Sequence, residues 1–198
     1  MRHDLITRFR TRRTWRRATT VQQLATHTAA WLDGTLPFHA IPGTELAPET
    51  HDLASTLAAA NLAGFLTTDS QPGHHPVVGH DAAVYEQRAA VTGFVADPRL
   101  LRHLQETGRA NGLTVITHTV DSTVPDYLVV TRRDGQPAAA FGERITAAQL
   151  RATWHGISAR AHRALTEAVQ VTVIDPQWGR NDRMWHALAY VVSKTFGP

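Results

Sequence analysis

The stretch GFLTTDSQPG at residues 64–73, followed by QRAAVTGF at residues 87–94, decides the expected fold. The first stretch predicts a short strand that ends near Thr68 and leads into a long polar loop over residues 69–83. The second predicts the next strand, with a Gln-Arg pair at its start. Two strands joined by a loop are usually neighbours in space. We therefore expect the polar side chains that end the first strand to lie beside the Gln-Arg pair.

Helices and strands are expected on both sides of these two stretches. Capping residues, helical spacing of apolar side chains and glycine stops predict the helices, whereas β-branched runs predict the strands. Three helices are expected after a cap at Thr19 or Thr20, from Pro48, and after a cap at Asp97, and three more over residues 146–154, 158–168 and 183–196. Strands are expected over residues 65–68, 88–96, 113–119, 127–131, 138–141 and 169–174, with a hairpin turn at residues 133–135. This pattern predicts an α+β fold with a mixed, largely antiparallel sheet of about five or six strands and helices packed on it.

The N-terminal segment is strongly basic. The first 17 residues contain seven arginines and one aspartate, a net charge of +6, whereas the whole chain has a net charge of +3. We expect residues 1–18 to form a flexible basic arm and residues 19–198 to form a single α+β domain. Arginines interleaved with Phe9 and Trp15 suit nucleic-acid contact through phosphate pairing and stacking. The candidate arm residues are Arg8, Arg10, Arg12, Arg13, Arg16 and Arg17.

Composition excludes several classes of protein. The 198 residues include no cysteine, which excludes disulfides, thiolate zinc sites and a cysteine nucleophile. No apolar run reaches the about 18 residues of a membrane span, and no signal-peptide core follows the basic N-terminus. We therefore expect a cytoplasmic protein with no membrane partner; the sequence does not predict the oligomeric state.

The polar residues of the two quoted stretches are the candidate site. A turning backbone after a strand can point amides at an anion or carbonyl oxygen, and hydroxyls add donors. A guanidinium at the start of the next strand can bind a carboxylate or phosphate with two hydrogen bonds. The candidate ligand-binding residues are Thr67, Thr68, Gln71, Gln87, Arg88 and Arg180, and the candidate catalytic residues are Asp69 and Ser70.

Structural interpretations of the same residues remain open. Asp69 and Ser70, with the Pro-Gly pair that follows, are also typical of a tight turn. Arg88 can equally form a salt bridge to Asp69 or Glu86. Arg180 lies in a connector between the last strand and the last helix, where a purely structural role is favoured.

A group of histidines follows the first strand. His74, His75 and His80 precede Asp81, and imidazoles with a carboxylate can bind zinc or nickel. Their spacing matches no metal signature, so no metal site is predicted and no cofactor is named.

Three functions are compatible with these features. The favoured one is binding of a small polar or anionic molecule, such as a nucleotide, a phosphate or a carboxylate or amide metabolite, with hydrolase or transferase activity as an extension. The first alternative is a nucleic-acid-associated or regulatory protein that uses the arginine arm. The second is an interaction module without catalysis.

Five motifs, in order, resemble an uncharacterised domain family of actinobacteria. They are WLDG at residues 31–34, NLAGF at 61–65, TTDSQPG at 67–73, QRAAVTGF at 87–94 and WGRND at 178–182. The resemblance covers roughly residues 14–188 and implies an intracellular bacterial protein. The family has no known activity, so the resemblance implies no catalytic residues, and the basic arm lies outside it.

Overall fold

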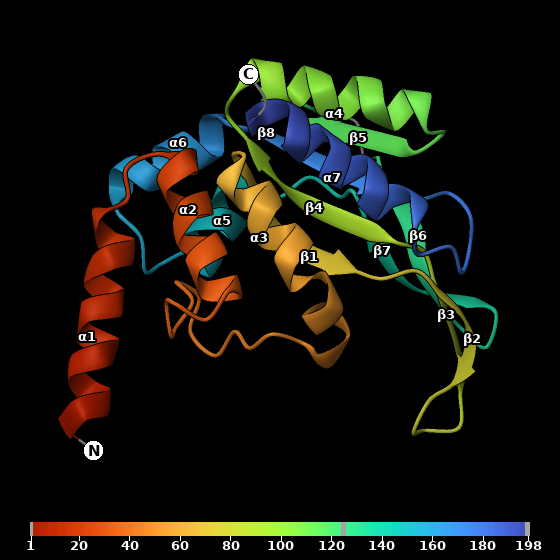
Figure 1. Cartoon of the computed structure of the whole chain (residues 1–198), viewed down its shortest axis with the longest axis horizontal. Coiled ribbons are helices and arrows are strands. Elements are labelled where there is room, and N and C mark those ends of the chain that lie inside the picture. Colours follow the sequence, from red (N-terminus) through yellow and green to blue (C-terminus); the bar gives the residue numbers. More distant parts are fainter. Residues whose placement is uncertain (1, 124–125, 197–198) are drawn as a thin grey trace.

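The computed structural model describes residues 2–123 and 126–196. Its first sheet contains β1 (Phe65–Gln71), β4 (Ala90–Val95), β8 (Val169–Ile174) and β5 (Thr114–His118), in that order. All neighbouring strands are antiparallel, and β1 lies at one edge (Figure 1). The expected pairing of the strands from the two quoted stretches is confirmed, since Phe65 pairs with Val95 and Gln71 with Ala90.

A second antiparallel sheet has the order β2 (His74–Val78), β3 (Val84–Gln87), β6 (Leu128–Arg133) and β7 (Gln136–Phe141). The expected hairpin joins β6 to β7 and turns at Asp134 and Gly135, which have positive φ values of 51° and 79°. The described residues thus form eight strands in two sheets, rather than about five or six in one. β2 falls within the segment predicted as a loop because its five side chains are all exposed and show no apolar alternation.

Three helices cover one face of the first sheet. They are α3 (Ala54–Leu62), preceded by the 3-10 helix η1 (Pro48–Leu53), α4 (Pro98–Ala110) and α7 (Arg183–Phe196) (Figure 1). The core between helices and sheet includes Leu57, Phe65, Val91, Leu104, Val171 and Leu188.

The opposite face of the first sheet is shared. At one end α2 (Val21–Leu32), α5 (Ala147–Thr153) and α6 (Ala159–Glu167) pack around Leu66 and Phe94. At the other end Ala90, Val130 and Ile174 form a small core where the second sheet meets the first. Helices packed on antiparallel sheets confirm the predicted α+β class.

Several helix ends form where side-chain caps were expected. The Thr20 hydroxyl accepts a hydrogen bond from the Gln23 amide at the start of α2, over 3.1 Å. Asp97 caps α4 in the same way through the Arg99 amide, over 2.8 Å. These bonds satisfy amides that the first helical turn leaves unpaired.

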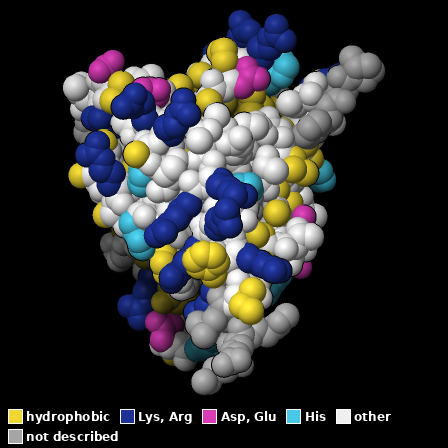
Figure 2. Space-filling view, turned by 90° about the vertical axis from the view of Figure 1, so that its left-hand side faces the viewer, with side chains coloured by type: hydrophobic (Ala, Val, Ile, Leu, Met, Phe, Trp, Pro, Cys, Tyr) yellow, Lys and Arg dark blue, Asp and Glu magenta, His cyan; other side chains and the backbone are white. Residues whose placement is uncertain are grey.

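The basic N-terminal segment forms the helix α1 (Arg2–Arg17), whose N-terminal end points away from the other elements in Figure 1. Thr11 and Trp15 are only 4% and 1% exposed, and the Trp15 indole donates a hydrogen bond to the Phe38 carbonyl over 3.0 Å. The Ser158 hydroxyl binds the Ala18 carbonyl just beyond the helix, over 2.6 Å. The second half of α1 therefore packs into the same core as α2, α5 and α6. Figure 2 shows Lys and Arg side chains gathered over this side of the molecule.

Candidate functional site

The structure separates the predicted site residues into two groups. Thr67, Thr68, Asp69 and Ser70 line a hollow at the free edge of β1. Gln71, Gln87, Arg88 and Arg180 lie at a junction between the two sheets, and none of them lines that hollow.

Gln71 joins the two sheets. Its side-chain nitrogen donates hydrogen bonds to the carbonyls of Arg88 and Val130, over 2.9 and 3.0 Å. Its side-chain oxygen accepts a hydrogen bond from the Thr131 hydroxyl over 3.1 Å. Gln71 is 6% exposed, so its amide is nearly buried with both its nitrogen and its oxygen hydrogen-bonded.

Arg88 stacks on an aromatic ring of the WGRND motif. Its guanidinium carbon lies 4.1 Å from the centroid of Trp178, and Arg132 approaches the same ring at 4.2 Å. A second contact is a hydrogen bond from Nη1 to the Val129 carbonyl, over 2.8 Å. Burial, and then the charge of Arg132, lower the pKa of Arg88. The Gln87 carbonyl accepts a hydrogen bond from the Gly179 amide next to this ring, over 3.0 Å.

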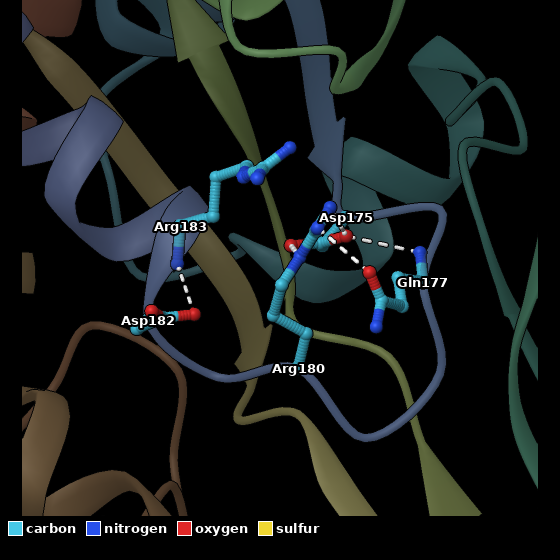
Figure 3. A network of polar contacts seen from close by, with 5 residues as sticks. All are labelled: Asp175, Gln177, Arg180, Asp182 and Arg183. Carbon is cyan, nitrogen blue, oxygen red and sulfur yellow. Dashed lines mark hydrogen bonds and ion pairs between the residues drawn. The ribbon is translucent and has the colours of Figure 1, made fainter.

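Arg180 is held by a buried carboxylate (Figure 3). Its Nε and Nη2 donate to the two oxygens of Asp175, each over 2.6 Å, and its Nη1 donates to Gln177 over 2.7 Å. Asp175 is fully buried, and such paired hydrogen bonds are the strongest geometry for an arginine and a carboxylate. The guanidinium of Arg180 is thus engaged inside the molecule.

The hollow at the edge of β1 is acidic, and we call it the carboxylate hollow. It has a volume of about 290 Å³ and is lined by Glu45, Glu49 and Asp69 without any lysine or arginine. A bulge at Thr68 interrupts the pairing of β1 with β4 between Thr67 and Asp69. Such an extra residue changes the direction of the side chains that follow it.

Asp69 remains accessible to solvent within this hollow, although protein atoms surround its carboxylate. That partial burial raises the pKa of the Asp69 carboxyl group, and the nearby negative charge of Glu49 raises it further, against a lowering hydrogen bond from the Ser70 backbone. Partial burial is therefore the main cause of the raised pKa of Asp69, and the like-charged Glu49 is a smaller one.

A second hollow lies between α1 and the loop that follows α2, and we call it the arginine hollow. Its volume is about 320 Å³. One face of α1 lines it with residues at helical spacing, namely Arg8, Thr11, Arg12, Trp15 and Arg16. The loop over residues 38–44 lines it too, together with His155 and Gly156. Among the described residues, no carboxylate lines it.

His39 lies between the two hollows and lines both of them. Its ring centroid lies 4.8 Å from Trp31, 5.1 Å from Trp15 and 5.4 Å from Trp154. Burial among these rings lowers the pKa of His39 to about 4. Its Nδ1 accepts a hydrogen bond from the Ile41 amide over 3.2 Å, so the neutral ring has its proton on Nε2.

Sequence reasoning did not identify His39, Trp31 or Trp154 as site residues. The signal for the arginine hollow was present in the 3.6-residue spacing of Arg8, Thr11, Arg12, Trp15 and Arg16, which was interpreted as a charge cluster rather than as a helix face. The aromatic cluster joins residues of α1, α2, the loop after α2 and the end of α5, and no local pattern reveals such contacts.

The histidines after β1 form no metal centre in the described part of the chain. No group of three or more His, Cys, Asp or Glu side chains there is arranged to hold a metal ion. Asp81 instead pairs with Arg133 over 2.9 Å and accepts a hydrogen bond from the Tyr85 hydroxyl over 2.9 Å.

The fold and the two hollows define an α+β domain with a candidate ligand-binding site beside an arginine-rich helix. The chain belongs to the family described as a domain of unknown function (DUF6919), whose model matches residues 10–194. This match begins inside α1. No curated protein matches the chain. Among the described helices, none has both the length and the apolar character needed to cross a bilayer.

Proposed function

We propose that this protein binds a small polar molecule with a phosphate or carboxylate group, and that the arginine hollow holds that group. The observation that supports this most strongly is the position of the Thr11 side chain. It is 4% exposed, it lines the hollow, and its hydroxyl forms no side-chain hydrogen bond with the described residues. The hydroxyl is not among the buried polar atoms that are closed to solvent, so it keeps access to the hollow, where a ligand oxygen can accept its hydrogen bond.

The charges around Thr11 favour an anion. Arg12 and Arg16 are exposed, and neither forms an ion pair with a described side chain. Arg8 also lines the hollow, with its guanidinium carbon 4.9 Å from the centroid of Phe38. Guanidinium groups on successive helical turns, next to a hydroxyl donor, suit the oxygens of a phosphate or carboxylate.

The aromatic wall favours a ligand with a planar apolar part. Phe38, Trp15 and the neutral ring of His39 line the same hollow. Stacking on such rings adds to the charge interactions and selects ring-bearing anions over bare ones. This accounts for a nucleotide-like or aromatic metabolite better than for inorganic phosphate alone.

Isothermal titration calorimetry with phenyl phosphate tests this proposal. We expect phenyl phosphate to bind more tightly than inorganic phosphate, and the Arg12→Gln/Arg16→Gln variant to bind it at least about tenfold more weakly. The control, Arg102→Gln/Arg109→Gln, removes the same charge from exposed positions on α4 and should bind normally. Equal affinity of the two variants, or no binding by the wild type, would refute the proposal.

A second candidate function is binding of a nucleic acid on the outer surface of α1 and its neighbours. α5 and α6 add exposed arginines next to α1, and Glu167 is their single carboxylate. Arginine side chains thus extend beyond the hollow over the side shown in Figure 2. On α1, α5 and α6, the exposed arginines that do not line the hollow include Arg10, Arg13, Arg17, Arg151, Arg160 and Arg163.

The two faces of α1 allow the two functions to be tested separately. Removal of residues 1–17 would delete the buried Trp15, so charge substitutions are the better test. Arg10→Gln/Arg13→Gln/Arg17→Gln should weaken nucleic-acid binding and reduce its salt slope by up to about 3. Phenyl phosphate binding should not change. If the triple variant binds DNA and RNA as the wild type does, the nucleic-acid function is wrong.

A further inference from the structure

We propose that the carboxylate hollow is a binding site for an organic cation, such as a primary amine or a guanidinium group. This inference rests on the proposed function in one respect: the cation and the anion are two ends of the same small ligand. The ligand would then have a positive group near Asp69, a negative group near Arg12 and an apolar part beside His39.

The carboxylates of this hollow lack a cationic partner in the described part of the chain. Glu49 and Asp69 line the hollow together, and no ion pair joins either to a lysine, arginine or histidine there. Two neighbouring carboxylates repel each other unless a cation lies between or beside them. An organic cation supplies that charge.

A buried hydroxyl opens into the same hollow. Thr50 is 8% exposed, lines the hollow, and forms no side-chain hydrogen bond with the described residues. It is not among the buried polar atoms that are closed to solvent, so its hydroxyl faces the open space of the hollow. A hydroxyl oxygen accepts a hydrogen bond from an ammonium or guanidinium group. Thr50 is therefore an independent sign that the hollow receives a polar group.

The walls of the hollow favour an organic cation over a metal ion. The rings of Trp31, Trp154 and His39 line the hollow together with its carboxylates, and His39 contacts both indoles. Aromatic faces attract ammonium and guanidinium groups, and acidic side chains beside them add charge neutralisation. The described chain has no group of three or more metal-ligating side chains here or elsewhere.

The two hollows are close enough to share residues. His39, Ile41 and Thr44 line both. A molecule that extends past His39 therefore passes from an arginine-lined space to a carboxylate-lined space. The same small set of residues would contact its apolar middle part.

Benzylamine, which is cationic at neutral pH, and benzyl alcohol, its neutral isostere, test the inference by calorimetry. We expect the wild type to bind benzylamine at least about tenfold more tightly than benzyl alcohol, because charge-assisted hydrogen bonds are lost with the alcohol. The Glu49→Gln/Asp69→Asn variant should lose this preference. Glu49→Gln alone should lose part of the preference for benzylamine. Because Glu49 is exposed, this single variant tests the inference even if the double variant folds poorly. Glu106→Gln on α4 is the control.

Two results would overturn the inference: equal affinity for benzylamine and benzyl alcohol, or full benzylamine affinity in the double variant. Phenyl phosphate is titrated in parallel to separate the two proposals. If phenyl phosphate binds and benzylamine does not, the cation site is wrong and the proposed function stands. If only benzylamine binds, the proposed function is wrong, and so is the inference of a single ligand with both charges.

Discussion

The rings of Trp31 and His39 lie 4.8 Å apart and are tilted by 57° to each other. This contact places an imidazole ring in the wall between a basic and an acidic hollow. Because burial lowers the pKa of His39 to about 4, the ring is neutral at physiological pH and acts as an apolar surface with one hydrogen-bond donor.

The lowered pKa of His39 predicts a pH-dependent stability. The unfolded chain protonates this ring near pH 6.5, whereas the folded chain does so only near pH 4, so the stabilising contribution is complete above pH 6.5 and is lost as the pH falls toward 4. When the pH falls from 7.5 to 4.5, we expect the unfolding free energy of the wild type to decrease by about 2 kcal/mol more than that of His39→Gln. Urea denaturation at the two pH values measures this. An identical loss in both proteins would contradict the buried, neutral ring, and His103→Gln on α4 is the control.

The bidentate pair of Arg180 and Asp175 predicts a large stability effect. Arg180→Ala leaves the fully buried Asp175 carboxylate without its partner, which should cost about 3–5 kcal/mol and lower the melting temperature by roughly 6–20 °C. Arg183→Ala removes a neighbouring exposed arginine and should change the melting temperature little (Figure 3). Differential scanning calorimetry of both variants measures these changes in melting temperature. Equal, small changes would show that the pair does not stabilise the fold.

A glycine at the sheet junction predicts a further loss. A Cβ atom at Gly73 would overlap the carbonyl oxygen of Arg180, so Gly73→Ala must displace backbone and should cost more than about 2 kcal/mol. Gly112→Ala meets no atom within 4 Å and is strained only by its φ of +64°, so it should cost about 1 kcal/mol. Chemical denaturation measures the unfolding free energy of both variants. An equal cost would argue against the close contact between Gly73 and the Arg180 carbonyl.

Local signals in the sequence predicted much of the fold. Thr20, Asp97 and the Asp134–Gly135 turn specify their elements through short-range hydrogen bonds and backbone preferences, and each forms where it was expected. β2 has no buried face, so its sequence lacks the alternation on which strand prediction depends. Helix α1 was interpreted as an arm because its many arginines obscured the buried Trp15 and Thr11.

The candidate site was only partly accessible from sequence. Residues of TTDSQPG, QRAAVTGF and WGRND do meet: the Gly73 amide donates to the Asn181 side chain over 2.8 Å, and Arg88 stacks on Trp178. Their contacts join the two sheets. The aromatic cluster depends instead on how α1, α2 and α5 pack against one loop, and long-range packing of this kind leaves no periodic pattern in the chain.

The chain has five tryptophans, and their indole N–H signals in a two-dimensional ¹H–¹⁵N NMR spectrum provide the most direct test of the central claim. Trp15 lines the arginine hollow, whereas Trp178 and Trp185 lie outside both hollows. On titration with phenyl phosphate, we expect the Trp15 signal, assigned with Trp15→Phe, to shift saturably while the Trp178 and Trp185 signals stay fixed. An unmoved Trp15 signal, or saturable shifts confined to Trp178 and Trp185, would contradict anion binding in the arginine hollow.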